Sequence, residues 1–156
     1  KYLYKYYDEG RTILILSERR EHLINMMETI NEHYGSEQAG LYIGGIHPEI
    51  LEHNAGLRVI LGTYPMSSEG LDIPTLDSVI FTTPKSSIEQ SIGRITRRVH
   101  ETIPIAYDIV DNIAVFPRQY QKRETVYKRL SYDVYTLSVN VNPETTENYS
   151  KSTGKF

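Results

Sequence analysis

The stretch RTILILS, residues 11–17, decides the class of fold because it is a short, continuous run rich in Ile and Leu. Such runs are typical of strands that are buried on both faces, as in a parallel sheet. Apolar residues then recur at helical spacing from Leu23 to Tyr34, until Gly35 ends the pattern. Ser17 can cap this helix, which we expect over residues 19–34. A buried strand followed by an amphipathic helix predicts an α/β architecture.

The same alternation continues along the chain. Further short apolar runs predict strands at residues 41–43, 58–63, 78–83 and 104–110. The segments between and after them predict helices at 48–54, from Ser86 or Ser87 to 99, and at 117–130. Strands that alternate with helices indicate a parallel sheet with helices on both of its faces.

The two ends of the chain differ from this pattern. Residues 1–10 are charged and rich in Tyr, and we expect the end of a helix or linker there. Residues 133–141 alternate between apolar and polar side chains, which predicts an extra strand with one solvated face at a sheet edge. We therefore expect one α/β domain over residues 11–141 and a loosely held polar tail over 142–156. The first residue is Lys1, so we expect a piece of a longer protein.

Composition excludes several classes of function. The 156 residues fit one domain, and the formal net charge of -3 lacks the strongly basic balance of many nucleic-acid-binding proteins. The absence of Cys excludes disulfides and thiolate metal sites. His47 and His53 lie six residues apart and do not share a helical face, so we expect no metal site. Without a signal-peptide pattern, we expect an intracellular, non-secreted protein.

Two polar stretches follow neighbouring strands, at the edge where open α/β sheets bind ligands. The later stretch carries Gln90, Arg94 and Arg97 at positions i, i+4 and i+7 of one expected helix. Guanidinium groups bind phosphate oxygens with fixed pairs of donors, so this face suits a polyphosphate. An ordinary exposed charged helix is the alternative.

The earlier stretch, TYPMSSEGLDIP, spans residues 63–74, and its second half, residues 69–74, is expected to be a loop with two carboxylates around a glycine. Asp72 at a strand's carboxyl edge can accept hydrogen bonds from a ribose, and Thr63 offers a hydroxyl to a phosphate. The alternative is a turn in which Asp72 and its glycine neighbour serve backbone geometry.

Together the two stretches resemble the C-terminal RecA-like lobe of superfamily 2 helicases. Residues 63–74 resemble helicase motif V, and residues 90–97 resemble motif VI, with the pattern Q-x-x-G-R-x-x-R. Residues 13–23 are similar to the motif IV region, Gly44-Gly45 to a glycine turn, and Thr82-Thr83-Pro84 to motif Va. The resemblance runs from Arg11 to Asp111 and is closest to helicases of large DNA viruses and phages. It favours DNA over RNA and, if the protein is viral, a place in the host cytoplasm or virion.

The resemblance implies roles for named residues. Arg94 and Arg97 would be arginine fingers for the γ-phosphate of ATP, and Gln90 would couple the nucleotide to the cleft. Asp72 would bind the ribose, with Glu69 and Gly70 shaping its loop. A further set would lie near the backbone of a single-stranded or duplex nucleic acid: Thr63, Ser17, Gly44, Gly45, Thr82 and Thr83.

The sequence lacks two motifs of such motors, the phosphate-binding G-x-x-x-x-G-K-[ST] and the acidic D-E-x-[DH]. We therefore expect ATP and its Mg²⁺ to be held by an N-terminal RecA-like lobe of the same protein, and this chain alone to lack ATPase activity. The alternative function is a non-catalytic interaction module derived from a RecA-like fold. A flavodoxin-like nucleotide binder is disfavoured because no phosphate loop follows the first strand.

A basic helix is also expected near the end of the chain. Its cations form either a solvated face or a surface that follows phosphates: Arg118, Lys122, Arg123, Lys128 and Arg129.

Overall fold

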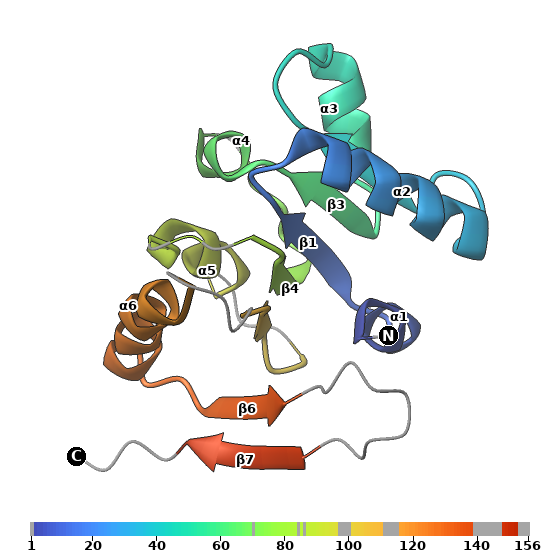
Figure 1. Cartoon of the computed structure of the whole chain (residues 1–156). Helices are drawn as coiled ribbons and strands as arrows, with labels where there is room; N and C mark the ends of the chain where they lie inside the picture. Colours follow the sequence, from blue (N-terminus) through green and yellow to red (C-terminus); the bar gives the residue numbers. More distant parts are fainter. Residues whose placement is uncertain are drawn as a thin grey trace.

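The computed structural model describes residues 2–69, 71–83, 85, 87–96, 101–110, 116–138 and 148–152. Within these ranges the main sheet has five strands in the order β2-β3-β1-β4-β5, and every neighbouring pair is parallel. Figure 1 shows β1, β3 and β4 side by side at the centre of the molecule. The predicted α/β parallel sheet is confirmed.

The strands lie where the apolar runs predict them. Their bounds are Thr12–Leu16 for β1, Ala39–Tyr42 for β2, Val59–Gly62 for β3, Leu76–Phe81 for β4 and Ile105–Asp108 for β5. β1, β3 and β4 are buried along almost their whole length, because helices cover both faces of the sheet.

The helices alternate with the strands along the chain. Their bounds are Tyr2–Asp8 for α1, Arg20–Tyr34 for α2, Pro48–Ala55 for α3, Tyr64–Glu69 for α4, Glu89–Ile95 for α5 and Phe116–Arg129 for α6. Gly35 ends α2 as predicted, with a positive φ of 99° and an amide that donates to the carbonyl of Asn31. At the start of the chain, where the sequence predicts the end of a helix or a linker, the structure has the helix α1.

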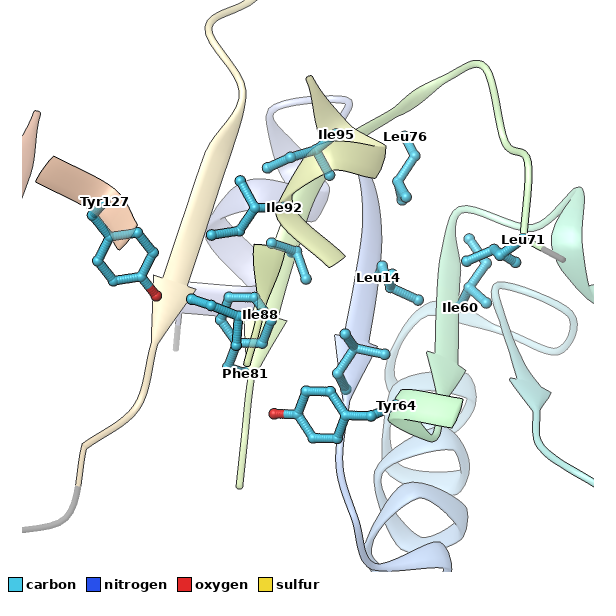
Figure 2. Packing of buried hydrophobic residues seen from close by; sticks show 12 residues of the cluster. Leu14, Ile60, Tyr64, Leu71, Leu76, Phe81, Ile88, Ile92, Ile95 and Tyr127 are labelled. Atoms are coloured by element: carbon cyan, nitrogen blue, oxygen red, sulfur yellow. The ribbon is translucent and has the colours of Figure 1, made fainter. Parts of the chain in front are cut away.

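Each face of the sheet has its own hydrophobic core. Ile13 and Ile15 of β1 point to the face that α1 and α2 cover. Leu14 and Leu16 point to the opposite face, which α4, α5 and α6 cover. Figure 2 shows this second core, in which three Ile side chains of residues 88–95 pack between the sheet and Tyr127 of α6. The alternation along β1 thus gives helices on both faces, as predicted.

The edge strand β2 is held by two Asn side chains. Asn31 of α2 donates to the carbonyl of Ala39 and accepts from the amides of residues 38 and 39. Asn54 of α3 donates to the carbonyl of Leu41, at 2.8 Å, and lies directly over Gly40. A Cβ at Gly40 would meet the Asn54 Cγ at 2.6 Å, so only glycine leaves room for this contact.

Three features of the secondary structure differ from what the sequence predicted. Residues 64–69, for which no helix was predicted, form α4, with Pro65 in its first turn and the Ser67 and Ser68 hydroxyls bonded to the carbonyl of Tyr64. α5 begins after Ile88, because Ile88 is buried in the core and fixes the start of the helix there.

The third difference concerns the end of the chain. The predicted strand exists as β6, Val134–Ser138, but it does not join an edge of the main sheet. It pairs antiparallel with β7, Asn148–Ser152, in a separate two-stranded sheet (Figure 1). The tail that we expected to be loosely held therefore contains a strand, β7, which supplies the hydrogen-bond partners of β6. No described helix is long and apolar enough to cross a bilayer.

Candidate functional site at the carboxyl edge of the sheet

The predicted site residues follow the carboxyl ends of the strands. Because the strands are parallel, these ends lie at one edge of the sheet, which we call the rim. Strand order places Gly44, Thr63, Ser17 and Thr82 along the rim in that sequence, after β2, β3, β1 and β4 respectively. The structure thus brings together residues that are up to 65 positions apart in the chain.

The ends of β1 and β4 are joined by side-chain hydrogen bonds. Thr82 donates its amide and its hydroxyl to the carbonyl of Leu16, each at 2.9 Å. The Thr83 hydroxyl accepts from the amide of Glu18 at 2.9 Å. Ser17 is fully buried, and its hydroxyl accepts from the amide of Arg19 at 3.1 Å. Ser17 therefore holds the turn before α2 rather than offering its hydroxyl to solvent.

Tyr64 links the end of β3 to this region. Its ring is 3% exposed and stacks on Phe81, while its hydroxyl donates to the carbonyl of Thr83 at 2.8 Å. Burial raises the pKa of Tyr64 to about 12, although the bond with Thr83 opposes the rise. The Lys85 Nζ lies 5.3 Å from the centre of the Tyr64 ring and 3.1 Å from Glu18. Contacts from the end of β1, from Tyr64 and from Glu18 therefore hold the residues that follow β4 at the rim.

Arg94 of α5 lies against the segment that precedes Asp72. One terminal nitrogen donates to the carbonyl of Ser68 at 2.6 Å, and the other donates to the carbonyl of Leu71. Asp72 is exposed to solvent immediately after this contact. The two predicted motifs thus meet through Arg94, whose guanidinium holds the backbone of the segment between α4 and β4 directly before the exposed Asp72.

The other predicted nucleotide contacts vary in what is described. Gln90 is exposed on α5, one turn before Arg94. Glu69 is the last residue of α4, and its side chain lies outside the described part. Gly70 and Arg97 also lie outside the described residues.

Asp72 borders an open groove of about 320 Å³, whose lining includes Tyr42, Leu51 and Leu71. An exposed carboxylate beside a groove fits the sugar of a nucleotide, whereas the Arg94 guanidinium donates to backbone carbonyls outside the lining of this groove, and the sequence lacks a loop to cradle the phosphates. The residues present therefore fit part of an ATP site.

The glycine turn after β2 is accessible. Gly44 is half-buried and Gly45 is exposed, and a Cβ on either would meet open space. Gly45 has a φ of +85°, which favours glycine over residues with a side chain. The turn can therefore bring backbone amides close to a ligand.

Sequence reasoning missed several cations at the rim. Arg19 and Arg20 are exposed where β1 passes into α2, and Lys85 follows the end of β4. Their signal was their position, because each comes within four residues of the end of a strand at the ligand-binding edge.

The basic helix was partly misjudged. Arg118, Lys122, Lys128 and Arg129 are exposed, but Arg123 is 1% exposed and faces the core. Its Nε and one terminal nitrogen donate to the two oxygens of Asp108, at 2.7 and 2.9 Å.

The Asp108 carboxylate is also bonded by Tyr127, whose hydroxyl donates at 2.9 Å. Burial and this carboxylate together raise the pKa of Tyr127. For Arg123, burial lowers the pKa, but the bond and charge of Asp108 outweigh it and the net shift is upward. The signal for this buried network was present in the helical spacing of Tyr120, Arg123 and Tyr127.

Comparison with known proteins gives relatives for the chain. No protein-family model matches it. Over 131 residues it is 40% identical to the Acanthamoeba polyphaga mimivirus protein named "Putative ATP-dependent RNA helicase". The match covers 82% of this chain and 25% of the viral protein, so the chain spans about a quarter of that relative's length.

Solved structures share the fold. The SWI2/SNF2 ATPase core domain of Sulfolobus solfataricus matches 83% of this chain and 28% of its own, with a TM-score of 0.62 and 12% identity. The Hef helicase domain of Pyrococcus furiosus matches 79% and 26%, with a TM-score of 0.58 and 20% identity. The C-terminal part of the Fun30 ATPase domain matches 74% and 40%, with a TM-score of 0.57 and 12% identity.

The sequence match and the shared fold agree with the resemblance carried by residues 63–74 and 90–97. Over most of its length the chain is similar to a mimivirus protein named "Putative ATP-dependent RNA helicase", and it shares the α/β fold of solved helicase and SWI2/SNF2 ATPase domains.

Proposed function

We propose that the chain is the second motor lobe of an ATP-dependent helicase or translocase. The observation that carries the proposal is the contact of Arg94 with the carbonyls of Ser68 and Leu71, directly before the exposed Asp72. It joins the two motifs through one guanidinium and leaves the carboxylate of Asp72 accessible to a ligand. The name of the viral relative, which contains "ATP-dependent" and "helicase", supports the same function.

In this function, the ATP site is completed from two lobes. Arg94 and Arg97 neutralise charge on the γ-phosphate, and Asp72 binds the ribose in a loop shaped by Glu69 and Gly70. Gln90, exposed one turn before Arg94, couples the nucleotide to the closing cleft. ATP and Mg²⁺ are held by the N-terminal lobe, because the sequence of this chain has no motif for either. Arginine fingers supplied in this way raise the rate of hydrolysis by ~10³–10⁵.

The rest of the rim grips the nucleic-acid backbone. Thr63, Thr82 and Thr83 are half-buried there, and the Gly44-Gly45 turn is open. Arg19 and Arg20 add positive charge beside them, since the start of α2 leaves both exposed. Ser17 acts through the turn that it holds. Such a grip recognises phosphates rather than bases, so it is insensitive to sequence and weakens as salt rises.

The fold does not distinguish DNA from RNA as the ligand, so a binding experiment has to decide between them. The sequence favours DNA, whereas the name of the viral relative contains RNA. We therefore propose a single strand as the ligand, measured with DNA and RNA oligonucleotides of equal length over a range of salt concentrations. Binding by this chain that does not respond to salt, or that depends strongly on sequence, would contradict the proposed grip.

The nucleotide role is tested in the parent protein with Arg97→Ala and Arg94→Gln. In Arg94→Gln the positive charge is lost, and the shorter side chain gives up the bonds to the carbonyls of Ser68 and Leu71. Each variant should lose most ATP turnover when it is measured at a temperature at which circular dichroism shows the variant to be folded. Arg118→Ala, on the exposed side of α6, is the matched control and should keep full turnover.

Unchanged turnover in both variants would overturn the motor lobe and support the alternative, a non-catalytic interaction module. The chain by itself should not hydrolyse ATP. Hydrolysis by the purified chain that Arg94→Gln abolishes would show that a neighbouring lobe is unnecessary.

A further inference from the structure

The segment that follows β4 is fixed from two directions. At its start, Thr82 and Thr83 are bonded to the end of β1 through the carbonyl of Leu16 and the amide of Glu18. At Lys85 the fixing group is Arg123 of α6, whose remaining terminal nitrogen donates to the Lys85 carbonyl at 2.8 Å. The backbone at Lys85, two residues after Thr83, is therefore held by a helix that begins more than 30 residues later in the chain.

All three guanidinium nitrogens of Arg123 have acceptors. Two donate to Asp108 at the end of β5, and the third donates to the Lys85 carbonyl. The Tyr127 hydroxyl also donates to Asp108, and so limits how the carboxylate can turn. The planar fork of Arg is needed here, because the single nitrogen of Lys cannot satisfy a carboxylate and a carbonyl on opposite sides of it.

The network is more specific than packing requires. Arg123 lies between Tyr120 and Tyr127 on the inner side of α6, where an apolar side chain would also fill the space. Buried ion pairs are often no more stabilising than well-packed apolar residues, because both charges lose their hydration. What an apolar residue could not do is hold the Lys85 carbonyl at a defined place next to the rim.

We propose that Arg123 is a positioning residue for the nucleic-acid grip: through the Lys85 carbonyl it holds Thr82 and Thr83 in the geometry that receives a phosphate backbone. This inference rests on the proposed function of the rim. Without the Arg123 bond, Thr82 and Thr83 keep their bonds to the end of β1 but lose the anchor on their other side, so part of their ordering cost falls on strand binding. The effect therefore falls on the affinity for nucleic acid and spares the ATP site at Arg94 and Asp72.

The test uses the full parent protein and measures ATP turnover as a function of single-strand concentration. Arg123→Lys keeps the charge but loses the fork, and should raise the KM for the strand about tenfold, as expected for one lost bond from a charged donor. The kcat at saturating strand and the KM for ATP should change less than twofold.

Tyr127→Phe is the matched control, because it removes a bond to the same carboxylate without touching Lys85. It should lower the melting temperature while leaving the KM for the strand unchanged. If Arg123→Lys fails to fold, the double variant Arg123→Gln with Asp108→Asn replaces the buried ion pair by a neutral amide pair, and the same rise in KM is expected.

An unchanged KM in the Arg123 variants, or an equal rise in Tyr127→Phe, would overturn the positioning role and leave only a structural one. A wild-type protein whose turnover does not respond to any single strand would instead overturn the proposed grip, and the positioning role with it. If the wild type responds to the strand but Arg123→Lys leaves the KM for the strand unchanged, only the positioning role fails and the proposed grip stands.

Discussion

The two edges of the main sheet use similar residues in opposite ways. At the amino edge, Arg11 and Asp77 are each 8% exposed, and the Arg11 Nη1 lies 3.7 Å from an Asp77 oxygen. Arg11 also donates to the carbonyl of Ile103, and Thr102 donates to Asp77. At the carboxyl edge, Arg19 and Arg20 are exposed to solvent, as are Asp72 and Gln90 of the candidate nucleotide site. Polar groups at the amino edge thus satisfy one another, whereas the rim leaves polar groups accessible.

Two further arginine side chains hold the backbone: Arg94, which is half-buried, and Arg123, which is buried. Arg94 binds the carbonyls before Asp72, and Arg123 binds the carbonyl of Lys85. A rim can be both rigid and open when its main chain is anchored from below. We therefore expect substitutions at the amino edge to change folding, and those at exposed rim positions to change binding.

The largest expected effect on stability is at the amino edge. Asp77→Ala removes the buried carboxylate beside Arg11, whose Nε keeps the exposed Glu9 at 3.3 Å, and also removes the acceptor of Thr102, which together should cost about 1–3 kcal/mol of unfolding free energy. Denaturant unfolding followed by circular dichroism measures this loss. Thr102→Val removes one hydrogen bond to the same carboxylate and should cost about 1 kcal/mol.

The comparison of the edges would fail if Asp77→Ala, at a temperature where it is fully folded, bound single strands more weakly than the wild type. That result would mean that the amino edge also contributes to binding.

Tyr64→Phe should have a smaller effect, about 1 kcal/mol, because it removes only the hydrogen bond to the Thr83 carbonyl. It also has a pH signature. The pKa of Tyr64 rises from 10.0 to about 12 on folding, so the stability that it contributes is complete below pH 10 and is lost as the pH rises to about 12.

Between pH 10 and pH 12, the unfolding free energy should therefore fall less steeply with pH for Tyr64→Phe than for the wild type. Equal slopes would show that the Tyr64 hydroxyl is not held in a buried site, and would weaken the account of the rim.

Much of this fold could be predicted from local sequence. The five parallel strands coincide with short apolar runs. The helix α2 has the predicted helical spacing and ends at Gly35, and α3 begins at the predicted proline, Pro48. Residues that follow strands were predicted at the rim for the same reason, since parallel strands end at one edge.

The errors arise where a residue's partner is distant in sequence. Arg123 looked like part of a solvated basic face because its acceptors, Asp108 and the Lys85 carbonyl, lie 15 and 38 residues away. The pattern of β6 predicts a strand but cannot name its partner, which is β7. In α4, Pro65 and two serines suggest a loop, but the buried ring of Tyr64 anchors a short helix.

Arg20→Ala should leave the unfolding free energy within about 0.5 kcal/mol, because its side chain is exposed. Its effect should appear in the salt dependence of binding. If Arg20 contacts a phosphate, the slope of log K against log salt should fall by about 0.7 for a single strand. Lys122→Ala, on the exposed face of α6, is the control and should leave the slope unchanged.

Asp72→Asn should have the smallest effect on folding, with no measurable change in the unfolding free energy, because the exposed carboxylate is replaced by an amide of the same shape. In the parent protein the same variant should raise the KM for ATP, since an amide accepts hydrogen bonds from ribose hydroxyls less strongly than a carboxylate. Turnover with a 2′,3′-dideoxy nucleotide, which lacks those hydroxyls, should be equally poor for wild type and variant. If the variant is clearly less stable than the wild type but binds ATP equally well, Asp72 is a structural carboxylate like Asp77. The contrast between carboxylates that stabilise the fold and carboxylates that bind ligands would then fail at Asp72.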